Sequence, residues 1–132
     1  MSSVRGTRGY IESISNQANG CFANGWYDAC AVMLRRLLET LIIEAFEKHG
    51  SADSIKGAQG DFLYLRELIS KTLSENTWNL SRNCKQALPK LKDLGDRSAH
   101  SRRYLAPKLE IENLASDIRL AVQELLCIAG LK

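Results

Sequence analysis

The sequence predicts an all-α protein built as a bundle of four to five helices. Its 132 residues include only two prolines, and apolar residues recur every three or four positions through most of the chain. Hydrophobic residues make up 45% of the chain and charged residues 25%, which is the composition of a globular domain rather than of a disordered chain. We therefore expect a single helical domain over residues 1–132, with its core over about residues 10–130.

Apolar periodicity places the helices in order along the chain. The expected helical regions are 10–23, 27–49, 62–73, 78–94 and 107–129. The second region is the clearest, because six apolar positions fall on one face before the stop at Gly50: Cys30, Met33, Leu34, Leu37, Leu41 and Ala45. Pro89 either kinks the fourth region or begins a new helix, because proline has no N–H for the preceding turn.

Cysteine usage and hydropathy predict a cytoplasmic protein without membrane segments, metal or cofactor. The N-terminus lacks the apolar run of a signal sequence, and charges interrupt the aliphatic stretches within four or five residues. The four cysteines lack the C-x-x-C spacing of a zinc site, and only two histidines are present. We expect these cysteines to be reduced and mostly buried: Cys21, Cys30, Cys84 and Cys127.

Positive charge is concentrated in residues 82–108. This segment has eight basic residues against Asp93 and Asp96, a net charge of +6, so the remainder of the +3 chain carries −3. Such a segment forms either a solvated helix face or a surface that binds phosphates. The residues that we expect to bind nucleic acid are Arg102, Arg103 and Lys92.

Arg35 and Glu39 lie four residues apart in the second helix, on an otherwise apolar background. Arginine before glutamate is the weaker order for a local pair. A charge pair removed from water needs further hydrogen bonds. We therefore predict a partly buried ion pair that is bonded to another element of the fold.

The stretch from Leu94 to His100 contains one of the two histidines within the most basic part of the chain. We expect Gly95 and Asp96 to form a turn in which the Asp96 side chain bonds a nearby amide. His100 is then either a structural imidazole that joins two helices or a catalytic group, with Arg97 three residues before it.

Two motifs resemble those of the HEPN superfamily, in its bacterial branch of domains of unknown function. The first is Cys30–Glu39, which fits A-x-x-x-x-R-x-x-L-E except that Cys30 replaces the alanine, and the second is Gly95–His100, which fits G-[ND]-x-x-A-H. The lead-in to the first motif, Gly25–Ala29, also matches. The likeness covers about residues 10–130.

The resemblance implies a helical bundle that dimerises. In the active branches, an R-x4-6-H motif from each of two subunits forms a metal-independent ribonuclease site at their interface. Histidine exchanges protons there, while arginine stabilises the charge that develops on the phosphate. This chain departs from that motif, because Asp93, Leu94 and Gly95 occupy the positions where the arginine belongs.

We expect, first, a HEPN-like interaction or RNA-associated module without the nuclease motif, homodimeric and with RNA or a protein as partner, in a defence or toxin-related system. A second hypothesis is a metal-independent endoribonuclease that uses His100 with Arg97 or Arg102. A third is a purely structural dimerisation domain.

Overall fold

The computed structural model describes residues 6–101 and 103–132 and confirms the all-helical class. The elements are α1 (Gly9–Ala23), α2 (Tyr27–Lys48), a 3-10 helix η2 (Ala52–Ile55), α3 (Leu65–Ser74), α4 (Arg82–His100), α5 (Lys108–Asn113) and α6 (Ala115–Ile128). Among the described residues there is no strand, and a single β-bridge joins Lys56 to Phe62.

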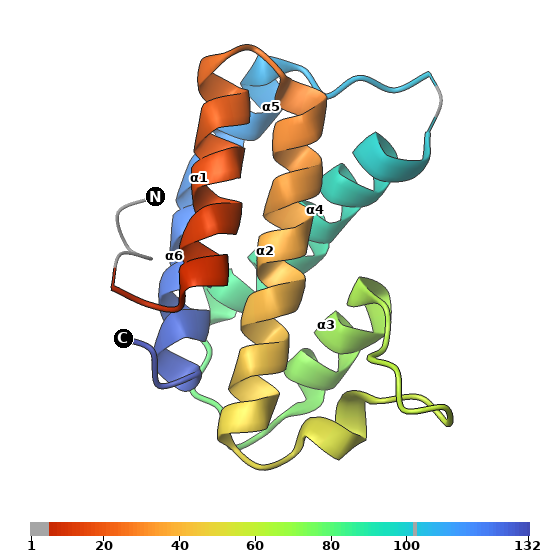
Figure 1. The fold of residues 1–132 in the computed structure, drawn as a ribbon, viewed down its shortest axis with the longest axis vertical. Coiled ribbons are helices and arrows are strands. Elements are labelled where there is room, and N and C mark those ends of the chain that lie inside the picture. Colours follow the sequence, from red (N-terminus) through yellow and green to blue (C-terminus); the bar gives the residue numbers. More distant parts are fainter. Residues whose placement is uncertain (1–5, 102) are drawn as a thin grey trace.

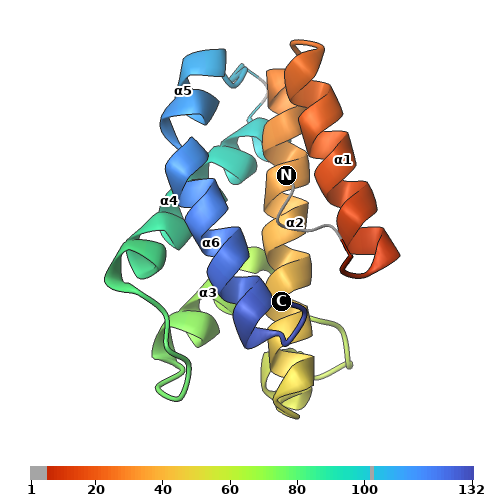
Figure 2. The same ribbon diagram turned by 90° about the vertical axis from the view of Figure 1, so that its left-hand side faces the viewer.

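Helix α2 is the centre of the bundle. It contacts every other helix, and α1 runs antiparallel beside it (Figure 1). Figure 2 shows α1 and α6 on two sides of α2, while α3 and the C-terminal half of α4 lie apart from each other on the same side of α2 in Figure 1. Two different surfaces of α2 are therefore flanked by neighbouring helices.

The core forms because α2 buries a broad apolar face. Its buried residues are Cys30, Ala31, Leu34, Leu37, Leu38, Leu41, Ile42, Ala45 and Phe46. Leu41 and Ile42 have no exposed surface, and burying a side chain of this size contributes about 1.5–3 kcal/mol. Trp78 packs against Phe46 with ring centroids 4.5 Å apart, which joins the segment before α4 to the same core.

Two helices begin later than the periodicity predicted. Phe62 precedes α3 and forms the bridge to Lys56. Helix α4 begins after Ser81, whose hydroxyl accepts a hydrogen bond from the backbone N–H of Cys84 at 3.1 Å. Glu124 of α6 accepts bonds from both the N–H and the hydroxyl of Ser81, which fixes the start of α4 against α6.

Helix α4 continues through both Pro89 and Gly95, so the turn predicted at Gly95 and Asp96 is wrong. Gly95 has no positive φ angle. A Cβ atom built on it would lie 2.6 Å from the Cβ of Arg35, so the glycine allows two helices to approach closely. Gly95, which suggested a turn in the sequence, instead marks the position where α4 packs closely against α2.

The last predicted helix is divided at Leu114, which ends α5 and begins α6. The segment before α5 is held to α2 by the backbone N–H of Ala106, which donates to Asp28 at 3.2 Å. In the part of the chain that the structure describes, no helix combines the length and apolar character that crossing a membrane requires.

Candidate functional site

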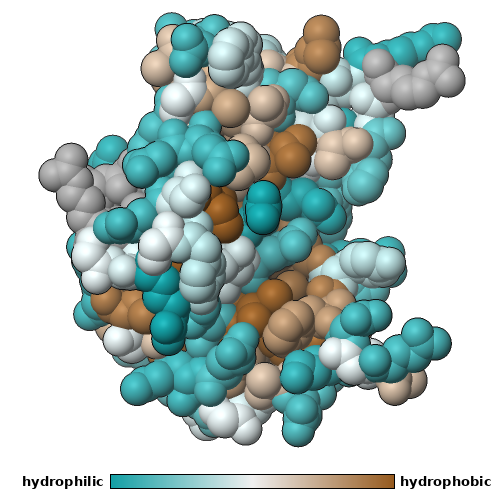
Figure 3. Space-filling view, viewed as in Figure 1, coloured by the Kyte–Doolittle hydropathy of each residue, from teal (hydrophilic) through white to brown (hydrophobic). Residues whose placement is uncertain are grey.

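An open cleft lies where α2, the first turn of α3 and the C-terminal half of α4 meet. Its volume is about 720 Å³, and the outline of the molecule is hollowed between α3 and the end of α4 (Figure 3). Nine residues line it: Arg35, Glu39, Tyr64, Leu65, Arg66, Glu67, Lys92, Asp96 and His100. Both sequence motifs thus contribute side chains to one cleft.

Asp96 joins the two motifs. Its carboxylate accepts a bond from Arg35 Nε at 2.9 Å and contacts Lys92 Nζ at 2.8 Å. Arg35 Nη1 also lies 3.5 Å from Glu39 Oε1. The Arg35 and Glu39 side chains are 22% and 32% exposed, so their pair is partly buried, and its further partner is Asp96 of α4.

The ionisable groups of this network differ in the direction in which their pKa values are shifted. Burial raises the pKa of Glu39; the nearby Arg35 guanidinium opposes that rise and the Asp96 carboxylate adds to it. Burial also disfavours ionised Asp96, but hydrogen bonds and charges from Lys92 and Arg35 outweigh this and lower its pKa. The bond to Asp96 raises the pKa of Lys92. Asp96 therefore ionises more readily than Glu39.

His100 is the last residue of α4 and lines the cleft from its exposed edge. Within the described residues its ring makes no hydrogen bond or ion pair, so it does not join two helices through such a bond. An imidazole of this kind can donate to or accept from a ligand that enters the cleft.

Arg97 has different surroundings from His100. Its guanidinium pairs with Glu110 of α5 and lies over the Tyr104 ring, 4.8 Å from the centroid. The Tyr104 hydroxyl donates to the same carboxylate, and burial followed by the Glu110 bond raises the pKa of Tyr104 to about 12. Arg97 does not line the cleft, so its guanidinium does not join His100 there.

The basic segment is only partly free to meet a ligand. Arg102 lies outside the described residues. Arg103 is exposed, and no carboxylate of the described residues pairs with it. Lys92 is held by Asp96 and by Asp93, whose Oδ1 atom is 3.2 Å from Lys92 Nζ. Of the three predicted nucleic-acid contacts, the structure places Lys92 in the cleft.

Helix α3 contributes residues to the cleft that neither sequence motif indicated. Tyr64 is 79% exposed and makes no side-chain cap on α3. The Arg66 side chain is 80% exposed and lies 3.5 Å from Glu67. The sequence contained only a weak indication of these cleft residues. Tyr64, Arg66 and Glu67 surround Leu65, which belongs to the apolar stripe of the helix.

The other histidine and the four cysteines lie outside the cleft. The ring of His49 contacts the backbone oxygen of Ile128 at 3.0 Å and packs on Trp78. All four cysteines are free, and Cys127 is exposed, contrary to a mostly buried set. Burial, followed by the neighbouring Cys21, raises the pKa of Cys30 to about 11. No cluster of metal-ligating side chains occurs among residues 6–101 and 103–132.

Comparison of the chain with protein-family models, curated proteins and solved structures found no match.

Proposed function

We propose that this chain is a HEPN-like RNA-binding module that holds phosphate groups of RNA in the α2–α3–α4 cleft and does not cleave them. The observation that carries the proposal is the convergence of three donors on one hollow: Arg66, Lys92 and His100. Phosphate groups are bound by such donors in proteins that recognise RNA.

The N-terminus of α3 adds to the attraction for an anion, while Glu67 in its first turn opposes it. Helix N-termini carry unsatisfied N–H groups and a partial positive charge, and Tyr64 leaves those groups without a side-chain cap. The Asp96 carboxylate repels a phosphate less strongly than an unpaired carboxylate would, because Arg35 and Lys92 both pair with it. Tyr64 offers an exposed ring on which an unpaired base can stack.

The absence of cleavage follows from the position of the arginine. In the active branches that the chain resembles, the cation at the phosphate is an arginine placed five to seven residues before the proton-exchanging histidine. Arg97 lies three residues before His100, but Glu110 and Tyr104 hold its guanidinium outside the cleft. The motif positions 93–95 contain no arginine.

The resemblance also motivates a cytoplasmic homodimer in a defence or toxin-related system. Three exposed apolar side chains support a surface for a second copy or another protein: Trp26, Leu105 and Leu109 are 62%, 77% and 66% exposed. The bond from Ala106 to Asp28 brings the segment of Leu105 to the start of α2, next to Trp26. Sedimentation of the wild type and of Trp26→Ser tests this: a dimer that the substitution weakens is expected, and a monomeric wild type contradicts it.

RNA binding is tested by fluorescence anisotropy with a labelled single-stranded RNA at several salt concentrations. Arg66→Gln is the test variant, and Arg82→Gln is its matched control. Both arginines are exposed, but Arg82 begins α4, about 27 Å along the helix from His100. We expect Arg66→Gln to weaken binding and to reduce the salt slope by about 0.7, the value for one phosphate contact on a single strand. Equal effects of the two variants, or no binding, would overturn the proposal.

Cleavage is tested on the same RNA in the presence of EDTA, with the wild type and His100→Ala. We expect the RNA to remain intact with both proteins. Cleavage by the wild type that His100→Ala abolishes would replace the proposal with the endoribonuclease alternative.

A further inference from the structure

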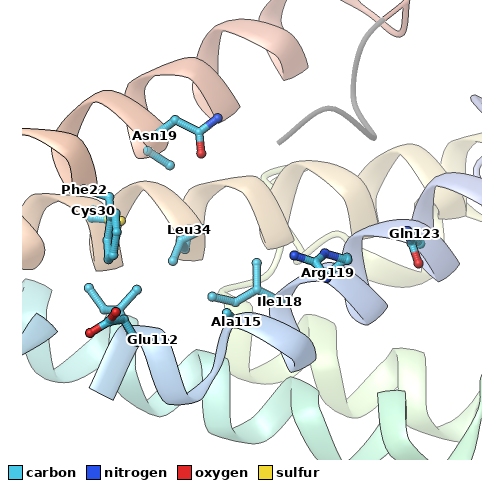
Figure 4. A pocket seen from close by; sticks show the side chains of 11 residues that line it. Asn19, Phe22, Cys30, Leu34, Glu112, Ala115, Ile118, Arg119 and Gln123 are labelled. Atoms are coloured by element: carbon cyan, nitrogen blue, oxygen red, sulfur yellow. The ribbon is translucent and has the colours of Figure 1, made fainter. Parts of the chain in front are cut away.

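A second hollow lies on another side of α2, between α1 and the α5–α6 segment (Figure 4). Its volume is about 510 Å³, within the range of roughly 300–1,000 Å³ typical of small-molecule sites. It shares no lining residue with the α2–α3–α4 cleft. We call it the α1–α6 groove. Binding of a ligand in this groove is therefore independent of the proposed RNA binding.

The floor of the α1–α6 groove is apolar and chemically inert. Phe22, Cys30, Leu34 and Ile118 form much of it. Cys30 is 3% exposed, and because burial raises its pKa to about 11, the thiol is neutral near pH 7 and is a poor nucleophile. The floor therefore favours an apolar body held without a covalent bond.

The rim of the α1–α6 groove is polar, and its two ends carry opposite charges. Arg119 and Gln123 lie toward one end, and Glu112 lies toward the other (Figure 4). Arg119 is exposed, and within the described residues it makes no ion pair or hydrogen bond. An anionic group is attracted to the Arg119 end and repelled from the Glu112 end.

We propose that the α1–α6 groove binds a small amphiphilic anion, an apolar chain with one carboxylate. The carboxylate lies at Arg119 and Gln123, and the apolar chain extends over Leu34 and Ile118 toward Phe22. The charge complementarity with Arg119 selects this class over a neutral apolar ligand. Because Arg119 is exposed, its ion pair with the carboxylate is expected to raise affinity by about two- to fivefold.

The probe is decanoate, titrated calorimetrically below its micelle concentration. Decanol has the same chain without the charge, and acetate has the charge without the chain. We expect one decanoate per chain, bound about two- to fivefold more tightly than decanol and more tightly than acetate. Equal affinity for decanol, or several decanoate molecules bound without saturation, would overturn the proposal.

Three variants test whether decanoate binds in the α1–α6 groove. Arg119→Gln is expected to reduce decanoate affinity to that for decanol, while Arg36→Gln, an exposed arginine of α2 outside the groove, leaves it unchanged. Ala115→Leu adds volume at an exposed groove position, outside the core, and is expected to weaken decanoate and decanol together. Circular dichroism checks that each variant is folded. Equal losses in Arg119→Gln and Arg36→Gln, or full binding by a folded Ala115→Leu, would contradict the site.

Discussion

The backbone of Gly95 lies against the side chain of Arg35, so that a Cβ atom at Gly95 would come within 2.6 Å of Arg35 Cβ. This close approach of α4 to α2 places Asp96, the next residue, where Arg35 Nε donates to it at 2.9 Å. The contact between the two helices and the ion network of the cleft therefore depend on the same pair of positions.

Gly95→Ala is expected to destabilise the protein. The added methyl group meets Arg35 Cβ, which cannot move away as the end of a flexible side chain can. Overpacking of this kind costs about 1–3 kcal/mol, against a gain of up to about 1 kcal/mol in helix propensity. The control is Gly20→Ala in α1, where nothing lies within 4 Å of the added Cβ and stability should rise. Urea denaturation measures both, and an unchanged or higher stability of Gly95→Ala would contradict the packing described.

Asp96→Asn is expected to lower the free energy of unfolding at pH 7 by about 1 kcal/mol, because it removes the charge that pairs with Arg35 and Lys92. Despite burial, the bonds to Lys92 and Arg35 hold the pKa of Asp96 below its ordinary value of 3.8. The advantage of the wild type is therefore complete above about pH 4 and is lost as the pH falls through the lowered pKa. A difference between the two proteins that stays constant down to pH 2 would refute this linkage.

Glu39 is expected to show the opposite pH dependence. Burial raises its pKa above 4.5 in the folded protein, so Glu39 contributes most stability when protonated, and this contribution falls as the pH rises through the raised pKa. Glu39→Gln should therefore be at least as stable as the wild type at pH 7 and should lose the gain on acidification. Glu47→Gln, at an exposed position of the same helix, is the control. Strong destabilisation by Glu39→Gln at pH 7 would show that its charge stabilises the fold.

The sequence was sufficient to predict the fold class, because the apolar stripe of α2 repeats from Cys30 to Phe46, over more than four turns, before the stop at Gly50. The boundaries were less predictable. Phe62 continued the apolar pattern of α3 but lies before it, and Leu114 continued the pattern of the last helix but divides it. Tertiary contacts decide such positions, and periodicity alone does not contain them.

The candidate site was predicted in part. The motifs identified Arg35, Asp96 and His100, and the structure brings all three to one cleft. The turn at Gly95 was wrong because glycine serves both turns and close helix packing, and one sequence cannot separate these uses. The sequestration of Arg97 depends on Glu110, thirteen residues away on another helix, which no local pattern reveals.

The two histidines give the most direct test of RNA binding in the cleft. His100 lines the cleft, whereas His49 lies at the far end of α2, packed on Trp78. The ring C–H resonances of both are followed by NMR while single-stranded RNA is added to the full chain. The account predicts that the His100 resonances shift and then saturate, while those of His49 stay in place. Stationary His100 resonances at saturating RNA, or equal shifts of both rings, would contradict it.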